Sequence, residues 1–311
     1  MTGRRSGPIE LIGVTDVATA FGLPLLTAVS WFVPARLWPR LGRWFSPFYR
    51  RSLSGEPLSA AVARLERLVA GTSIDGALDT VLRDVVADDI VSLFELLRDY
   101  RPGGWKPEID LSGREHVVAA LGQGRGAILW VAHFVPAKLV AKMALNRAGY
   151  AVSHLSHPSH GFSATRFGMR CLNRVQTAIE SRYLGERVVM SLNGSAGALE
   201  VLERRLAANG VVSISVRGKA QGAPISPFLK GEIGLAAGAL SLAHRSGAAL
   251  LPVFPLRNAS GGFTVFVEPP LDIDRSLGRR EASAAALRQY VGLLERYILA
   301  YPGQWLGWFH L

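Results

Sequence analysis

The sequence is poor in the residues that form crosslinks or bind metals. One cysteine, Cys171, is present among 311 residues, which excludes an internal disulfide framework and indicates a reducing compartment. We expect Cys171 to lie in a helix and to behave as a small apolar residue rather than a nucleophile. The segment "SHLSHPSHG" carries three histidines, but no cysteine or carboxylate nearby completes a zinc site, so we expect no bound metal.

Acidic residues are also scarce compared with basic ones. The chain has 24 Asp and Glu against 35 Lys and Arg, a net charge of +11. A basic excess suits nucleic acid, an anionic membrane surface or an acidic substrate such as a phosphorylated carrier. Nucleic acid is the least favoured partner, because the sequence has no zinc spacing, no RNP-type aromatic motif and no strongly basic recognition helix. Its 49% hydrophobic and 19% charged residues indicate a globular chain.

Long apolar runs are absent except near the N-terminus, where "VATAFGLPLLTAVSWFVPA" separates Asp16 from Arg36. A spanning helix needs about 20 apolar residues, and Pro24 and Pro34 interrupt this run. The arginines and aromatic rings of residues 36–51 are typical of a membrane interface. The pattern favours a helix in the membrane plane, with a transmembrane anchor and a buried helix pair as alternatives. No small-residue cleavage site follows, so a signal peptide is not indicated.

Residues 57–72 and 75–100 have apolar positions three and four apart, which predicts two amphipathic helices. "RPGGWKPEID" then breaks the pattern with prolines and glycines. We therefore predict an N-terminal helical, membrane-associating region over residues 1–110 and a second domain over residues 111–311.

Helical and strand patterns alternate from residue 113 onward. The predicted helices are 113–121, 136–147, 162–173, 195–210, 231–247 and 281–300. The predicted strands are 127–132, 150–155, 174–179, 211–216, 249–257 and 262–270. This alternation predicts an α/β fold with a mixed, mostly parallel sheet covered by helices on both faces. In such folds the functional site lies at the carboxyl ends of the strands.

His133 directly follows the most apolar of these strands, in "GAILWVAHF". Nothing about packing calls for an imidazole at that position. A neutral imidazole is suited to take a proton from a hydroxyl group at physiological pH. Pro136 suits the first turn of a helix, and a helix amino-terminus beside the ring disfavours its protonated form. We therefore predict that His133 is a general base.

Four segments, "GAILWVAHF", "PVF", "EPPLDI" and "YPGQWLGWFHL", resemble in their order and spacing the lysophospholipid acyltransferase-like superfamily. The most similar branch is that of the lipid A biosynthesis (lauroyl/myristoyl) acyltransferases, over about residues 114–311. The resemblance implies an acyltransferase that moves a fatty chain from acyl carrier protein or coenzyme A to a hydroxyl or amine acceptor. His133 would be its general base, with no covalent intermediate and no cofactor besides the donor. It also implies the cytoplasmic face of the inner membrane, with a peripheral or N-terminally anchored protein.

The signature of this family is a histidine followed five residues later by an acid, and here that position is Lys138. A nearby cation disfavours the imidazolium, and loss of the orienting carboxylate in an analogous serine-protease triad lowers the rate by about 10⁴. Glu200 and Glu232 are candidate replacement acids. Each has another interpretation, as a solvated charge beside Arg204 and as a residue in the first turn of a helix. The departure also leaves open a catalytically inactive protein that binds a lipid or an acyl carrier as a scaffold.

Several cations are candidates for contacting the substrate through its phosphate or carboxylate groups. They are Lys138, Arg166, Arg170, Arg217, Lys219 and Lys230. The histidines His154, His157 and His160 are predicted to form a polar loop that faces the substrate. Trp305 and Trp308 are predicted to be core or interface residues. "GQGRG" precedes a strand and is too short for a nucleotide-binding loop.

Overall fold

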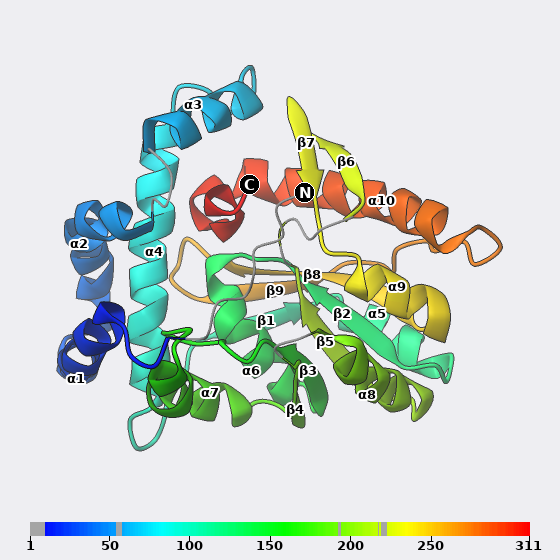
Figure 1. Ribbon diagram of the computed structural model, residues 1–311, viewed down its shortest axis with the longest axis horizontal. Helices are drawn as coiled ribbons and strands as arrows, with labels where there is room; N and C mark the ends of the chain where they lie inside the picture. The colour runs from blue at the N-terminus through cyan, green and yellow to red at the C-terminus, as the bar shows by residue number, and fades with distance from the viewer. Residues whose placement is uncertain (1–9, 54–57, 192–193, 217, 219–222) are drawn as a thin grey trace.

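Seven strands form the central sheet of the computed structural model, which describes residues 10–53, 58–191, 194–216, 218 and 223–311 (Figure 1). In spatial order they are β1 (Ile109–Ser112), β9 (Phe263–Val267), β8 (Ala249–Arg257), β2 (Ala127–Val131), β5 (Val211–Ser215), β3 (Val152–Ser156) and β4 (Glu186–Val189). Strands β8, β2, β5, β3 and β4 are parallel, whereas β9 pairs antiparallel with β8 and parallel with β1. The predicted mixed, mostly parallel sheet is therefore confirmed.

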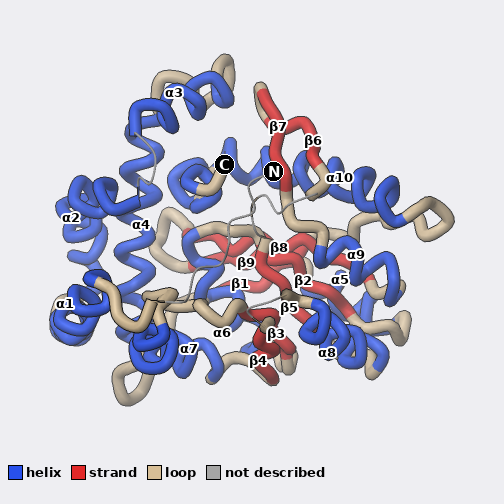
Figure 2. The backbone as a smooth tube through the Cα atoms, in the orientation of Figure 1, coloured by secondary structure: helices blue, strands red, loops and turns tan. Residues whose placement is uncertain are grey.

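Strand β2 is buried along its whole length, and its side chains alternate between two apolar cores. Ile128 and Trp130 belong to one core, and Leu129 and Val131 to the other. Because successive side chains of a strand point to opposite faces, both faces need a cover of helices. One face is covered by α8 (Ala196–Ala207), α9 (Gly238–Ser246) and α10 (Arg279–Ala300), and the other by α5 (Arg114–Gly122) and α6 (Val140–Arg147) (Figure 2). The predicted cover on both faces is confirmed.

The N-terminal helices gather around one long helix, α4 (Leu78–Asp99). Its neighbours are α1 (Val14–Phe32), α2 (Trp38–Leu53) and α3 (Leu58–Val69), with the short η1 (Ala35–Leu37) between α1 and α2 (Figure 1). Gly42 allows α2 to approach α4, because a Cβ atom there would lie 2.5 Å from the carbonyl oxygen of Ala87. The two predicted amphipathic helices are confirmed as α3 and α4.

Helix α1 is attached to the rest of the molecule at both ends. Near its start the buried carboxylate of Asp16 accepts a hydrogen bond of 2.7 Å from the hydroxyl of Thr165. Near its end the guanidinium of Arg98 donates to the carbonyl oxygens of Ser30 and Trp31, at 2.7 and 2.6 Å. The hydroxyl of Ser163, and after it the backbone N–H of Gly13 and the hydroxyl of Thr165, hold the pKa of Asp16 below its usual value. The helix therefore lies along the surface of the molecule.

The outward face of α1 is apolar. It exposes a row of large side chains at helical spacing, namely Val14, Val17, Phe21, Leu25 and Phe32. Among the described residues, α1 is the helix that is long and apolar enough to cross a membrane by length and composition. The buried helix pair considered from the sequence does not fit this exposure. The in-plane and the membrane-spanning arrangement of α1 both stay predictions.

Between residues 160 and 180 one sequence prediction was wrong and another was right only in part. Residues 174–179 are helical, within α7 (Asn173–Ser181), and the predicted helix over 162–173 begins only at Arg166 and passes through a π-helical turn, η3 (Gly168–Leu172). The β-branched residues of "NRVQTAIES" favour a strand locally. Burial of Asn173, Gln176 and Glu180 on one helical face outweighs that preference.

The predicted helix over 231–247 was wrong in its first part. Residues Gly231–Gly234 form strand β7, which pairs antiparallel with β6 (Ile225–Phe228), and α9 starts only at Gly238. The turn of this hairpin requires Leu229 at a positive φ of 51°, where its backbone N–H donates to the Glu295 carboxylate of α10 at 2.5 Å. The long-range contact with α10 thus stabilises a turn that local composition does not predict.

Candidate functional site

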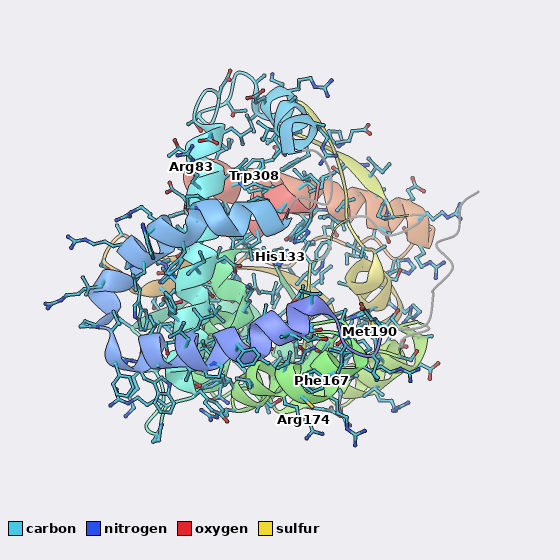
Figure 3. All side chains as sticks on the ribbon, turned by 60° about the vertical axis from the view of Figure 1, so that its left-hand side comes forward. Arg83, His133, Phe167, Arg174, Met190 and Trp308 are labelled. Carbon is cyan, nitrogen blue, oxygen red and sulfur yellow. The ribbon has the colours of Figure 1, made fainter. Side chains whose placement is uncertain are left out.

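His133 lies two residues beyond β2, at the carboxyl end of the parallel strands, as predicted. The adjacent Ala132 N–H still donates to β8, at 2.8 Å to the Val253 carbonyl, so the ladder holds the chain up to the histidine. Pro136 follows in a 3₁₀ turn, η2 (Val135–Lys138), and α6 starts later than predicted. Figure 3 shows His133 near the centre of the molecule.

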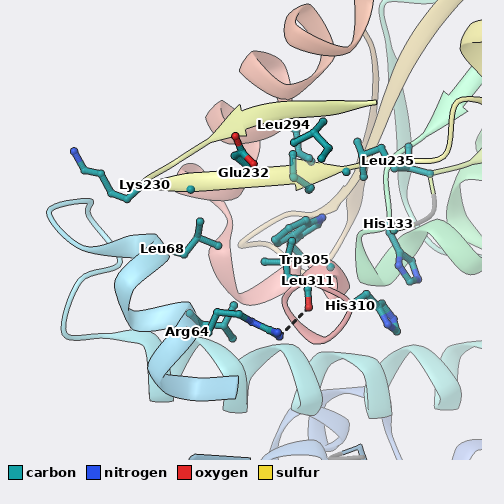
Figure 4. Close-up of a pocket in the computed structure, with 18 of the residues that line it drawn as sticks. Arg64, Leu68, His133, Lys230, Glu232, Leu235, Leu294, Trp305, His310 and Leu311 are labelled. Atoms are coloured by element: carbon teal, nitrogen blue, oxygen red, sulfur yellow. Dashed lines mark hydrogen bonds between the residues drawn. The ribbon is translucent and has the colours of Figure 1, made fainter. Parts of the chain in front are cut away.

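An apolar cavity of about 510 Å³ begins at His133 and extends between α3, the β6–β7 hairpin and α10. Its wall includes Leu65, Leu68, Ile233, Leu235, Leu294 and Trp305. Arg64 and Lys230 also line it, and Figure 4 shows both away from His133, on the side of α3. The shape and lining suit a hydrocarbon chain whose reactive end lies beside the imidazole.

A second cavity of about 1020 Å³ meets the first at His133, and we call it the polar cavity for the charged and hydroxyl side chains that its wall carries among apolar ones. Its wall carries the side chains Lys138, Lys142, His154, His157, His160 and Gln176, together with several serines. His133, Gly218 and His310 line both cavities. The imidazole of His133 is therefore placed where an apolar group from one side can meet a polar group from the other.

The cation at position 138 is paired. The ammonium of Lys138 lies 2.5 Å from a carboxylate oxygen of Asp89, a nearly buried residue of α4. Its backbone carbonyl accepts a hydrogen bond of 2.6 Å from the ammonium of Lys142. The sequence brings a positive charge to the place of the expected acid, and the fold supplies a compensating carboxylate from a helix of the N-terminal part.

The floor of the polar cavity is a buried charge network centred on Glu180 of α7. Its carboxylate lies 3.1 Å from the Lys142 ammonium and 2.9 Å from His160 Nε2, and it accepts a hydrogen bond from Gln176 at 2.7 Å. Burial raises the pKa of Glu180, but the charge of Lys142 and the contacts with His160 and Gln176 outweigh burial and lower this pKa below its usual value. Glu180 is therefore ionised and holds three cavity-lining side chains in place.

His154 is buried in the same cavity wall and does not carry a charge near neutral pH. Its Nδ1 lies 2.8 Å from the hydroxyl of Ser213 on β5. Burial, and after it the positive charge of Lys142, lowers the pKa of His154 well below 6.5. The prediction of a polar loop was wrong for His154, which lies in strand β3, although His154, His157 and His160 all line the cavity. In the described part of the chain no group of three His, Cys, Asp or Glu is arranged to hold a metal.

The other predicted site residues divide into three groups. Lys230 and Glu232 lie on the hairpin and line the apolar cavity, and Glu232 is in a strand, not in the first turn of a helix. Arg166, Arg170 and Glu200 are exposed and line neither of the cavities that meet at His133. Arg217 and Lys219 lie outside the described residues.

Two residues of the site had no sequence signal. Asp89 belongs to the helical pattern of α4 and reaches Lys138 across 49 positions of the chain. His310 lies near the end of the sequence, and its ring is stacked on that of His133, with centroids 5.2 Å apart. Both contacts depend on tertiary packing. Trp305 and Trp308 are buried, which confirms their predicted place in the core.

Comparison with known protein families gives one finding for this site. A family model described as bacterial lipid A biosynthesis acyltransferase matches residues 97–311. The matched range begins in the last turn of α4 and contains the whole sheet, His133 and the terminal aromatic segment. A search of curated proteins finds no match.

Proposed function

We propose that this chain, which belongs to the bacterial lipid A biosynthesis acyltransferase family, uses His133 as the general base of an acyl transfer. The donor is a fatty acyl thioester of acyl carrier protein or coenzyme A, and the acceptor is a lipid or another molecule with a hydroxyl or amine group. Family membership supports the general acyltransferase role. The observation that carries the finer proposal is the position of His133 at the junction of an apolar and a polar cavity.

The reaction follows from this placement. The acyl chain occupies the apolar cavity, where each buried methylene contributes about 0.8 kcal/mol, and its thioester carbonyl lies beside His133. The acceptor enters the polar cavity, and the imidazole takes the proton of its hydroxyl group as the oxygen attacks the carbonyl carbon. The tetrahedral intermediate then collapses with cleavage of the C–S bond, and the sulfur receives the proton from the imidazolium. General-base catalysis of this kind contributes about 10²–10⁴ in rate.

The charges around the cavities support the same assignment. Arg64 and Lys230 lie on the side of the apolar cavity away from His133, where the end of the acyl chain would lie, so we do not assign them to the phosphate groups of the donor. Asp89 compensates the charge of Lys138, which reduces the electrostatic penalty that this lysine imposes on an imidazolium nearby. Glu200 does not take the role of the acid that is missing at position 138, because it is exposed and lies in the wall of neither cavity.

We place the protein at the cytoplasmic face of the inner membrane, with α1 in the membrane plane. The support is that both ends of α1 are attached to the same body while its apolar row faces outward. A spanning helix would have to release one of these attachments. The exposed side chains of Arg40, Arg43 and Trp44 on α2 suit the lipid headgroup region beside such a helix.

The alternative function is a non-catalytic protein of the same fold that holds a lipid or an acyl carrier. Lys138 in place of the acid is the observation that favours it. The two functions differ in one result, because a scaffold binds the acyl donor without releasing free thiol.

The experiment is an acyl-transfer assay with the purified full chain in detergent. The donor is myristoyl-carrier protein or myristoyl-coenzyme A, the acceptor is a bacterial lipid extract, and products are identified by mass spectrometry. We expect an acylated lipid and release of thiol, both lost in His133→Ala and both retained in His116→Ala, a control on α5 far from the cavities. Donor binding without thiol release by the unaltered chain establishes the scaffold function instead.

A further inference from the structure

The ring of His310 is stacked nearly parallel to the ring of His133. The planes are inclined by only 11° and the centroids are 5.2 Å apart. His310 also lines both cavities, as His133 does, and Figure 4 shows the two rings beside each other at one end of the apolar cavity. A second imidazole at the reacting position is not part of the mechanism described above.

The backbone holds this stack in place. The N–H of Leu306 donates to the carbonyl of His133 itself, at 3.0 Å, and Phe134 forms an isolated β-bridge with Trp305. The chain then turns through η5 (Leu306–Phe309), and the His310 N–H donates to Gly307 at 2.9 Å. The terminal segment 301–311 is thus attached directly to the residue that carries the proposed base.

This attachment is also rigid. The indole N–H of Trp308 donates to the carbonyl of Pro302 at 3.0 Å, and its ring packs edge-on against Trp305. Both indoles are buried. The position of His310 is therefore determined by a packed aromatic core and not by a loose chain end.

We propose that His310 is a positioning residue that fixes the orientation of the His133 ring. The inference rests on the proposed function, in which the imidazole must present one nitrogen to the acceptor. Lys138 does not orient the His133 ring, because its ammonium is directed to Asp89. A parallel aromatic neighbour restricts rotation of the ring about its side-chain bonds.

Two variants separate the stack from general packing. His310→Phe keeps a flat ring of similar size, whereas His310→Ala removes it, and His116→Ala serves as a control elsewhere on the surface. We expect His310→Ala to lower kcat roughly 2- to 10-fold, the fold-change expected for one aromatic stack, with KM for donor and acceptor unchanged. His310→Phe should restore most of kcat. Equal losses in the Ala and Phe variants, or a changed KM with an unchanged kcat, contradict the positioning role.

A second measurement does not depend on activity. The Cε1–H resonance of His133 in a ¹H–¹³C spectrum is identified by its absence in His133→Gln. Because a stacked ring shifts the resonances of its neighbour, this signal should move in His310→Ala and remain close to its original place in His310→Phe. If the unaltered chain transfers no acyl group, the proposed function fails while this spectrum still decides the stack. If neither substitution shifts this resonance, the inference is wrong, even if His310→Ala is less stable than the unaltered chain.

Discussion

The buried charge network below the polar cavity gives the sharpest stability prediction. Glu180 and Lys142 are 1% and 8% exposed, and Glu180 also contacts His160 and Gln176. Glu180→Gln leaves the ammonium of Lys142 buried without its counter-charge. Removing one partner of a buried ion pair destabilises a protein by about 3–5 kcal/mol. We expect a loss of this size, measured by urea unfolding of the detergent-solubilised protein.

The exposed pair Arg245–Glu203 provides the matched control. Both side chains are 38% exposed, and exposed pairs contribute only about 0–1 kcal/mol, so Glu203→Gln should have little effect. Combining Glu180→Gln with Lys142→Met removes both charges and should recover most of the lost stability. The reasoning is refuted if Glu180→Gln costs no more than Glu203→Gln, or if the double variant is less stable than the single one.

The pH dependence of this prediction has a definite sign. The pKa of Glu180 is lower in the folded state than its ordinary value of 4.5. Its contribution to the free energy of unfolding is therefore fully present above about pH 4.5 and is lost as the pH falls toward the folded-state pKa. In Glu180→Gln this part of the acid destabilisation should be missing.

Three further predictions concern the site and the surface. Asp89→Asn leaves the Lys138 cation uncompensated, so kcat should fall about tenfold, which is a rise of about 1.4 kcal/mol in activation free energy. The added change Lys138→Gln should restore kcat. An unaffected kcat in Asp89→Asn would show that the pair does not influence His133. The buried His154 has a pKa below 6.5 in the folded state. Its contribution to the free energy of unfolding is therefore present above pH 6.5 and should decline by up to about 1.4 kcal/mol per pH unit below it. Equal pH slopes for the unaltered chain and His154→Asn in urea unfolding between pH 5.5 and 6.5 would contradict this. Phe21→Asp and Leu25→Asp each remove an exposed apolar side chain worth about 1.5–3 kcal/mol on burial, so flotation with anionic vesicles should drop at least tenfold, and undiminished flotation would argue against α1 as the docking helix.

The sequence predicts the central sheet well because β2 is apolar along its whole length, β8 is apolar up to Arg257, and β5 is apolar except for two serines. A fully buried strand needs a continuous apolar run, and such runs are visible without tertiary information. The same reasoning places His133 at the carboxyl end of β2. The strands β1, β4 and β6 have only four residues each. The burial of β1 and β4 follows no clear alternation, and the alternation of β6 is too short to predict a strand.

The electrostatics of the site could not be predicted in the same way. The sequence shows Lys138 where an acid is expected, but not that Asp89 of α4 lies 2.5 Å from its ammonium. The interpretation of Lys138 as an uncompensated cation beside the base is corrected by this pair. The spacing of residues along a helix shows which of them lie on the same face. It does not show which residue of another element they contact, because that depends on how the elements pack.

The contact of His310 with His133 was equally hidden. The aromatic residues near the end of the chain were predicted to be buried, and Trp305 and Trp308 are. A prediction of burial does not say which surface the segment covers. That information comes from the hydrogen bond between Leu306 and His133 and from the bridge between Phe134 and Trp305. The division of the chain at residues 110 and 111 stays a prediction.

The central claim is that His133 removes the proton of the acceptor while the acyl chain lies in the apolar cavity. The most direct test is to measure, for His133→Ala, both the equilibrium binding of myristoyl-carrier protein and the single-turnover rate of acyl transfer. The account predicts an unchanged dissociation constant with a rate lowered at least 100-fold. A single-turnover rate within a few-fold of that of the unaltered chain would contradict it.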